Sequence, residues 1–243
     1  MNDPASDRLR NNLAAIRGRM AEACRRAGRL PGDVTLVGVT KYVSAELAAD
    51  LVKAGCHDLA ESRPQSLWAK ADALAALAAA PRWHLVGHLQ RNKVRRTMPL
   101  VSLLHSLDSR RLLDTLDAEA RACGQTYDVL VEVNLTGDPE RTGLAIEEVQ
   151  PLLIAAAACL HVRVRGLMGM AAAPEGPEAA ATARRQFAGL REARDRFRRE
   201  APPTVSLDEL SMGMSEDFEE AILEGATLVR VGSALWEGVA GEV

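Results

Sequence analysis

The chain has 243 residues, of which 47% are hydrophobic and 26% charged, and its formal net charge is −3. This length is close to the ~250 residues of a (β/α)8 barrel and allows a full buried core. The weak negative charge gives no general attraction to nucleic acid or anionic membranes. No stretch approaches the ~20 apolar residues of a membrane span. Residues 1–10 lack the apolar core of a signal peptide, so we expect a cytoplasmic protein.

The four cysteines are scattered, and no CxxC pair or HExxH motif offers the spacing of a metal site. Cys56 and His57 are adjacent, but neighbours on a strand point to opposite faces, so they are a poor pair of ligands. We therefore predict structural thiols and no metal.

An amphipathic helix is predicted from Ala5 to Gly28, because Leu9, Leu13 and Ile16 recur at helical spacing. Beyond it, short apolar runs alternate with helical segments. The runs that predict strands are Thr35–Thr40, His57–Ala60, Trp83–Gly87, Leu103–Ser106, Val129–Asn134, Val162–Met168, Glu209–Ser211 and Leu228–Val231. The stretches that predict helices are Ser44–Ala54, Arg63–Ala79, Gln90–Thr97, Arg110–Cys123, Ile146–Cys159, Pro177–Arg199 and Glu216–Glu224.

Eight strands, each followed by a helix, are the pattern of a TIM barrel, the α/β fold with one closed parallel sheet. The second and seventh strands are only weakly indicated by their periodicity. Nothing in the composition marks a boundary between independent cores. We therefore predict a single domain over residues 1–243, with the N-terminal helix in 1–30 and the barrel in 31–243.

Lys41 closes the first strand, at the end of the barrel where (β/α)8 enzymes build their sites. A lysine there can be partly desolvated and can form a Schiff base with a carbonyl compound. An ordinary solvated lysine is the alternative. The residues that end the later strands should converge on the same mouth, and they are Glu61, Ser62, His88, Gln90, Ser106, Asp108, Asn134, Met168, Ser211–Ser215 and Gly232–Ser233.

Several of these residues also have structural explanations. Ser106, Asp108 and Ser215 are each suited to cap a following helix. His88, taken alone, fits a hydrogen-bonded core histidine as well as a functional one.

The segments after the seventh and eighth strands predict a phosphate site, because TIM barrels often bind phosphate there through backbone amides. Gly213 and Gly232 allow a close approach of the backbone. Hydroxyl groups are supplied by Ser211, Ser215 and Ser233. Glycine and serine also occur in ordinary turns. Together with Lys41, these segments suggest a pocket for a phosphorylated carbonyl compound.

Arg230 lies within the eighth strand, where an inward charge needs an acceptor because arginine stays protonated in proteins. A pyridine nitrogen kept unprotonated is one such acceptor. An outward-facing arginine, paired with a helix carboxylate, is the alternative.

Seven stretches, in order from the first strand to the last, resemble the pyridoxal-phosphate homeostasis proteins. They are VGVTK ending at Lys41, WHLVGHLQRNK (Trp83–Lys93), LLHSLDS (Leu103–Ser109), VEVNLTGDPERTG (Val131–Gly143), RGLMGM (Arg165–Met170), LSMGMSEDFEEAI (Leu210–Ile222) and VRVGSALWEG (Val229–Gly238). As a set they are far more specific than any single motif.

The resemblance implies a single barrel of the alanine-racemase N-terminal kind (fold type III) with pyridoxal 5′-phosphate (PLP) held as an internal aldimine on Lys41. It implies an Arg230 that faces the pyridine nitrogen. The phosphate contacts that it implies come from Ser211, Met212, Gly213, Gly232 and Ser233. The other residues expected at the cofactor are Ser62, His88, Asn134 and Met168.

The chain departs from the family pattern in four places. Where the family commonly has Gly-Glu-Asn after the second strand, Ala60–Ser62 reads Ala-Glu-Ser, and serine is shorter than asparagine and lacks the amide. Arg141 stands for a common lysine, Ser233 for a frequent threonine and Trp236 for the usual phenylalanine.

We expect the chain to serve intracellular PLP homeostasis by holding and releasing the cofactor rather than by catalysis. A PLP racemase needs a base on each face of its substrate, and fold relatives take a tyrosine from a second domain. The only tyrosines here are Tyr42, beside the lysine, and Tyr127, at the start of the fifth strand. The expected partners are PLP and PLP-dependent apo-enzymes, without nucleic acid or membrane, and the expected state is a monomer.

Two other functions stay open at this point. One is a PLP-dependent amino-acid racemase, or another enzyme of small amino acids, with His88 as the second base. The other is a PLP-free Schiff-base aldolase in which Lys41 attacks a phosphorylated sugar. The basic run Arg91–Arg96 is short and indicates a helix flank or an anion contact near the mouth rather than a nucleic-acid site.

Overall fold

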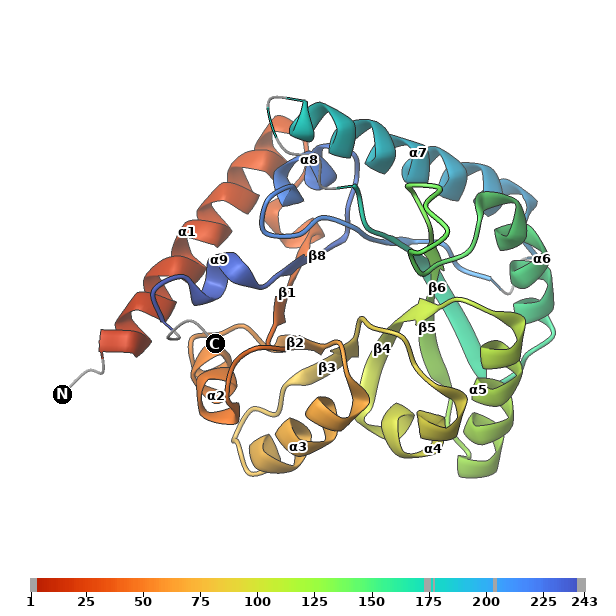
Figure 1. The fold of residues 1–243 in the computed structure, drawn as a ribbon, viewed down its shortest axis with the longest axis horizontal. Coiled ribbons are helices and arrows are strands. Elements are labelled where there is room, and N and C mark those ends of the chain that lie inside the picture. Colours follow the sequence, from red (N-terminus) through yellow and green to blue (C-terminus); the bar gives the residue numbers. More distant parts are fainter. Residues whose placement is uncertain (1–3, 173–175, 177, 203–204, 240–243) are drawn as a thin grey trace.

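The computed structural model describes residues 4–172, 176, 178–202 and 205–239. Within them, eight parallel strands close into a barrel in the order β1 to β8, so the predicted TIM barrel is confirmed. The helices form a ring outside the strands (Figure 1). The strands are β1 (Thr35–Val39), β2 (Asp58–Glu61), β3 (Arg82–Leu85), β4 (Val101–Leu107), β5 (Tyr127–Val133), β6 (Val162–Gly169), β7 (Glu209–Ser211) and β8 (Leu228–Val231).

The helices follow the predicted stretches with shifts at their ends. They are α1 (Pro4–Arg26), α2 (Ala45–Lys53), α3 (Pro64–Leu74), α4 (Val94–Thr97), α5 (Arg110–Cys123), α6 (Ile146–Ala157), α7 (Ala179–Glu200), α8 (Phe218–Leu223) and α9 (Ser233–Trp236), with 3-10 turns η1 (Pro31–Asp33), η2 (Arg91–Lys93) and η3 (Met98–Leu100). Helix α3 ends at Leu74, before the predicted Ala79, and turns lead from there to β3. The predicted helix start Pro177 lies outside the described residues.

The apolar side chains form two clusters, one on each side of the barrel strands. The larger cluster lies between the strands and the helices. The smaller cluster contains Val37, Ala60, Leu103, Leu130, Met168 and Leu228. These residues come from six different strands, so they mark the face of each strand that points to the barrel axis. Side chains two positions away along a strand share this inward face.

Helix α1 completes the ring of helices beside β1 and β8 (Figure 1). It packs on α8 and α9 and buries Leu9, Leu13 and Ile16. The Arg19 guanidinium adds two hydrogen bonds of 2.9 Å to the Glu219 carboxylate on α8. Within the described parts of the chain, no helix combines the length and the apolar character that a membrane span requires.

Gly166 of β6 lies so close to the backbone of β7 that a methyl group has no room. An added Cβ would lie 1.9 Å from the carbonyl oxygen of Glu209. We expect Gly166→Ala to lower the free energy of unfolding by about 1–3 kcal/mol, the usual effect of overpacking. Gly189→Ala on α7 is the control, since nothing lies within 4 Å of its added Cβ. Urea titration measures both, and equal stabilities of the two variants would contradict the close approach.

Candidate functional site

Lys41 stands at the rim of the barrel mouth. The side chains of Val37 and Val39 belong to the inner cluster, and Lys41 lies two residues beyond Val39 along the same row. Its ammonium lies 4.7 Å from the centre of the Tyr42 ring, and both side chains are exposed. The amine is therefore accessible to a small molecule that enters the mouth.

The backbone that leads to Lys41 is held by side chains from two other elements. The Trp236 indole donates a hydrogen bond of 2.8 Å to the carbonyl oxygen of Val39. The Lys70 ammonium donates one of 2.5 Å to the carbonyl oxygen of Thr40. Both carbonyl groups just before the lysine thus have a fixed partner. Trp236 at this position contributes a hydrogen bond that phenylalanine cannot make.

The position of Glu61 at the end of β2 predicts that its side chain lies in the mouth, and this prediction is wrong. Glu61 alternates with the inward-facing Ala60, so its side chain points into the layer between the barrel and α3. There it is fully buried and accepts hydrogen bonds of 2.6 Å from Lys70 and from the hydroxyl of Thr40. This buried pair fastens α3 to the strand ends beneath Lys41.

Arg230 points into the barrel, so the outward-facing alternative is wrong. It shares the inward face of Leu228 and is 4% exposed. Its Nη1 donates 2.6 Å to the hydroxyl of Ser211, and its Nη2 donates 3.2 Å to the carbonyl oxygen of Gly169. Burial lowers the pKa of Arg230 to about 10, against the opposing effect of Asp217 and other carboxylates. The guanidinium therefore stays charged at neutral pH.

A continuous chain of hydrogen bonds runs from Arg230 across the inside of the barrel. The Ser211 hydroxyl lies 2.8 Å from Nδ1 of His105, and Nε2 of His105 lies 2.9 Å from Nδ1 of His84. Nε2 of His84 then lies 3.1 Å from Oδ1 of Asp58. We call these five residues the Asp58–Arg230 chain. It connects β8, β7, β4, β3 and β2.

The two ends of this chain have opposite charges, and His105 in its middle is neutral. Burial is the main cause that lowers the pKa of His105 well below its ordinary value, and the charges of His84 and Arg230 act in the same direction. Burial acts to raise the pKa of Asp58, but hydrogen bonds from His84 and Arg82 outweigh it and hold this pKa at about 2. Asp58 is therefore a carboxylate at neutral pH.

The loops after β7 and β8 lie side by side at the mouth. The amides of Gly232 and Ala234 both point to the hydroxyl oxygen of Ser215, each at 3.3 Å. Gly213 has a φ of +91°, and an added Cβ would lie 2.6 Å from that of Ala221, so glycine is required there. These loops present backbone amides on a closely packed base.

Two of the predicted phosphate residues are engaged elsewhere through their side chains. The hydroxyl of Ser211 belongs to the Asp58–Arg230 chain. The side chain of Met212 is buried in the larger cluster, outside the barrel. Only the backbone of these residues can reach the mouth, whereas the Ser233 side chain is exposed at the start of α9.

The residues predicted from the middle strands have mixed surroundings. The Asn134 side chain organises its own loop, because Oδ1 accepts from the amides of Thr136 and Gly137 (3.0 and 3.1 Å). Met168 is fully buried in the inner cluster. Ser62 is partly buried at the end of β2. Of these three, Asn134 ends its strand at the rim, and Met168 fills the barrel below it.

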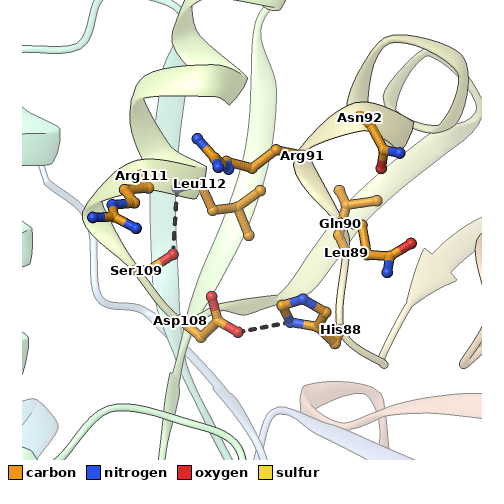
Figure 2. A pocket seen from close by; sticks show the side chains of 9 residues that line it. All are labelled: His88, Leu89, Gln90, Arg91, Asn92, Asp108, Ser109, Arg111 and Leu112. Carbon is orange, nitrogen blue, oxygen red and sulfur yellow. Dashed lines mark hydrogen bonds and ion pairs between the residues drawn. The ribbon is translucent and has the colours of Figure 1, made fainter.

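A cavity of about 560 Å³ lies beside the mouth, between the loop after β3 and the start of α5. Figure 2 shows His88 and Asp108 facing each other on one side of it, joined by a bond of 2.9 Å between Nδ1 and Oδ2, while Arg91 extends across the other side toward Leu112. His88 is exposed, so the core-histidine alternative is wrong. Ser109, rather than Asp108 or Ser106, caps α5.

No group of three or more histidine, cysteine, aspartate or glutamate residues in the described ranges is arranged to hold a metal ion. The four cysteines are free thiols.

The strand-end pattern of the sequence does not include His84, His105 and Asp58, which form most of the Asp58–Arg230 chain. The signal was available, because a histidine inside a buried strand must find a hydrogen-bond partner. Both histidines lie within such runs, WHLV and LLHS, two residues from an inward apolar side chain. Lys70 was overlooked because nothing in a helical pattern indicates which lysine will be buried.

Because His105 is buried, we expect the folded protein to become less stable as the pH falls. Since burial holds the folded pKa of His105 well below 6.5, the unfolded chain binds a proton below about pH 6.5 that the folded chain resists. The contribution of His105 to the free energy of unfolding is complete above about pH 6.5. It is lost as the pH falls, at up to about 1.4 kcal/mol per pH unit. Asp58 adds a loss between about pH 5 and pH 2. Urea titrations at several pH values measure this, and His105→Gln should remove the decline between pH 7 and pH 5.

Comparison with known proteins gives consistent matches over the whole barrel. Residues 6–238 match the family model of the alanine racemase N-terminal domain. The chain is 39% identical to the pyridoxal phosphate homeostasis protein of Aquifex aeolicus, over 92% of this chain and 95% of that protein. It resembles the solved structure of PipY from Synechococcus elongatus with PLP bound, at 33% identity and a TM-score of 0.81, over 93% of this chain and 99% of that one. An alanine racemase of Clostridium difficile, 17% identical, shares the fold with a TM-score of 0.72, over 95% of this chain and 56% of its own.

Proposed function

Because the chain belongs to the family of pyridoxal phosphate homeostasis proteins, we propose that it binds PLP at the barrel mouth and acts in PLP homeostasis. The observation that carries this proposal is the placement of an accessible amine and a buried guanidinium on neighbouring strands. Arg230 on β8 pairs with Val37 on β1, and Lys41 follows on β1 toward the mouth. PLP bound to the similar PipY structure supports the same assignment.

The mouth offers a suitable partner for each polar group of PLP. An amine such as that of Lys41 can bind an aldehyde covalently. The Arg230 guanidinium can only donate, so it suits a ring nitrogen that carries no proton. The amides of Gly232 and Ala234 both donate to the Ser215 hydroxyl, and a phosphate that takes the place of this acceptor would suit them. When bound, PLP supplies an electron-accepting ring and an aldehyde that reacts with amines.

We assign the remaining predicted residues to the walls of this site. The backbone of the β7 loop and the start of α9 would surround the phosphate. These residues are Ser211, Met212, Gly213 and Ser233. The sides of the mouth are assigned to Ser62, His88, Asn134 and Met168.

Holding and release, rather than rapid catalysis, is the proposed role. Racemisation needs a base on each face of the substrate. Tyr127 begins β5, at the opposite end of the barrel, and Tyr42 lies against the Lys41 amine itself. His88 is bonded to Asp108 in the side cavity. Racemisation or elimination of amino acids by the pure protein, lost in Lys41→Ala, would instead support an enzyme.

The recipients that we propose are PLP-dependent apo-enzymes, served by a monomer in the cytoplasm. The decisive experiment loads the protein with PLP, removes free cofactor and mixes it with a purified apo-enzyme. Recovery of enzyme activity is compared with the recovery given by an equal amount of free PLP. Transfer at or above the free rate supports delivery, whereas no transfer would refute it.

Lys41→Ala should abolish covalent attachment of the cofactor while leaving weaker binding through the phosphate contacts. The wild-type protein should show a visible absorption band that borohydride bleaches, with the added mass on the peptide that contains Lys41. Lys53→Ala is the matched control, since Lys53 is an exposed lysine paired with Asp50 on α2. A colourless wild-type protein that traps a sugar phosphate would support an aldolase instead.

Arg230→Gln should shift the absorption maximum of bound PLP and weaken its binding by about ten- to a hundredfold, the effect of losing a hydrogen bond from a charged donor. Spectral titration with PLP measures both quantities, and thermal unfolding checks that the variant is folded. Arg19→Gln at the surface of α1 is the control. An unchanged spectrum and affinity in a folded Arg230→Gln protein would refute the pyridine contact.

A further inference from the structure

The two outermost hydrogen bonds of the Asp58–Arg230 chain can each run in only one direction. At one end, the guanidinium of Arg230 has no acceptor, so the oxygen of Ser211 must accept from it. At the other end, the Asp58 carboxylate can only accept, so Nε2 of His84 must carry the donated proton. The directions of the outermost bonds are therefore fixed by chemistry alone.

The two histidines transmit this direction through the barrel. A neutral His84 with its proton on Nε2 has a bare Nδ1, which accepts from Nε2 of His105. The bare Nδ1 of His105 in turn accepts the single hydrogen of Ser211. With both rings neutral, each has one allowed tautomer, with its proton on Nε2. A doubly protonated His84 would instead donate from Nδ1 and reverse the two inner bonds.

We propose that Asp58, His84, His105 and Ser211 are positioning residues for Arg230. Their one-way chain fixes the guanidinium within the barrel and links it to a carboxylate at the far end. The hydrogen of Ser211 is committed to His105, so its oxygen is left to accept from Arg230. This inference rests on the proposed function only in that Arg230 faces the ring nitrogen of PLP.

Among the described residues, no carboxylate is in direct contact with the Arg230 guanidinium. The Asp58–Arg230 chain is therefore the main group of contacts that holds this charge in place. Besides Ser211, the Arg230 side chain has one bond of 3.2 Å, to the carbonyl oxygen of Gly169. If His105 were lost, the hydroxyl of Ser211 would be free to rotate and its oxygen would no longer be held toward Arg230. The remaining N–H groups of the guanidinium would then lose their fixed direction.

The far end of the chain lies at the opposite face of the barrel. Asp58 and the largely exposed Arg82 line a cavity of about 440 Å³ there, together with Arg17 and His57. Asp58 starts β2 and Arg82 starts β3, whereas Lys41 follows the end of β1. The chain therefore connects this amino-terminal face with the Arg230 side of the barrel interior.

The first experiment uses the wild-type protein without cofactor and needs no variant. Nitrogen-15 NMR of labelled imidazoles at pH 7 should show His84 and His105 neutral, with the proton on Nε2 in both. A proton on Nδ1 of His105, or a charged His105, would overturn the one-way chain. This result does not depend on whether PLP binds.

The second experiment uses the PLP-loaded protein and deletes one link at a time. Ser211→Ala, His105→Gln and Asp58→Asn should each shift the absorption maximum in the direction of Arg230→Gln. Each should weaken PLP binding by about three- to tenfold, the range for one buried hydrogen bond. Thr97→Val is the matched control, because it also deletes a buried hydroxyl. This hydroxyl donates to the carbonyl of Lys93 and accepts from the Trp68 indole, and it makes no bond to the chain.

The outcomes separate this inference from the proposed function. If Arg230→Gln shifts the spectrum but the three chain variants do not, the positioning role is wrong and the pyridine contact stands. If Arg230→Gln also has no effect, the pyridine contact itself fails. If Thr97→Val changes the spectrum as much as Ser211→Ala, the effect is a general loss of stability, and the inference is overturned.

Discussion

Arg230 places a guanidinium that cannot be neutralised inside a closed barrel, and burial of such a charge requires acceptors from within the protein. No backbone group on the inside of a paired sheet is spare, so the acceptors must be mostly side chains. Each of β3, β4 and β7 accordingly places a polar side chain, His84, His105 and Ser211, among the apolar residues of the inner cluster. This polar path through an otherwise apolar interior ends on the buried Arg230.

A second buried charge pair serves the other face of the same strands. Glu61 and Lys70 lie in the layer between the barrel and α3, and Lys70 also binds the backbone beside Lys41. The inner chain thus orients a donor below the mouth, while the outer pair fixes the backbone at the rim. Removing one partner of the Glu61–Lys70 pair leaves a buried charge uncompensated, which is strongly destabilising.

The strands and the strand-end residues could be predicted from the sequence because both depend on local patterns. Apolar runs between turn signals located six of the strands, and the alternation with helices located the weaker second and seventh. Lys41 and Arg230 follow from the bounds of β1 and β8. The direction of a side chain is less secure, because a shift by one residue moves it to the other face of the sheet. Glu61 illustrates this, since it was predicted for the mouth and lies one position from the inward Ala60. Contacts such as His84 with His105 depend on the register between strands, which a single sequence does not reveal.

The rim around Lys41 combines a hydrogen-bonded backbone with an exposed side chain. The carbonyl groups of Val39 and Thr40 are each occupied by a partner, whereas the amine lies in solvent beside an exposed ring. A guest held on such a residue can depart without displacement of the strand or helix that carries it. The rim itself would then keep the same shape in the loaded and the empty protein.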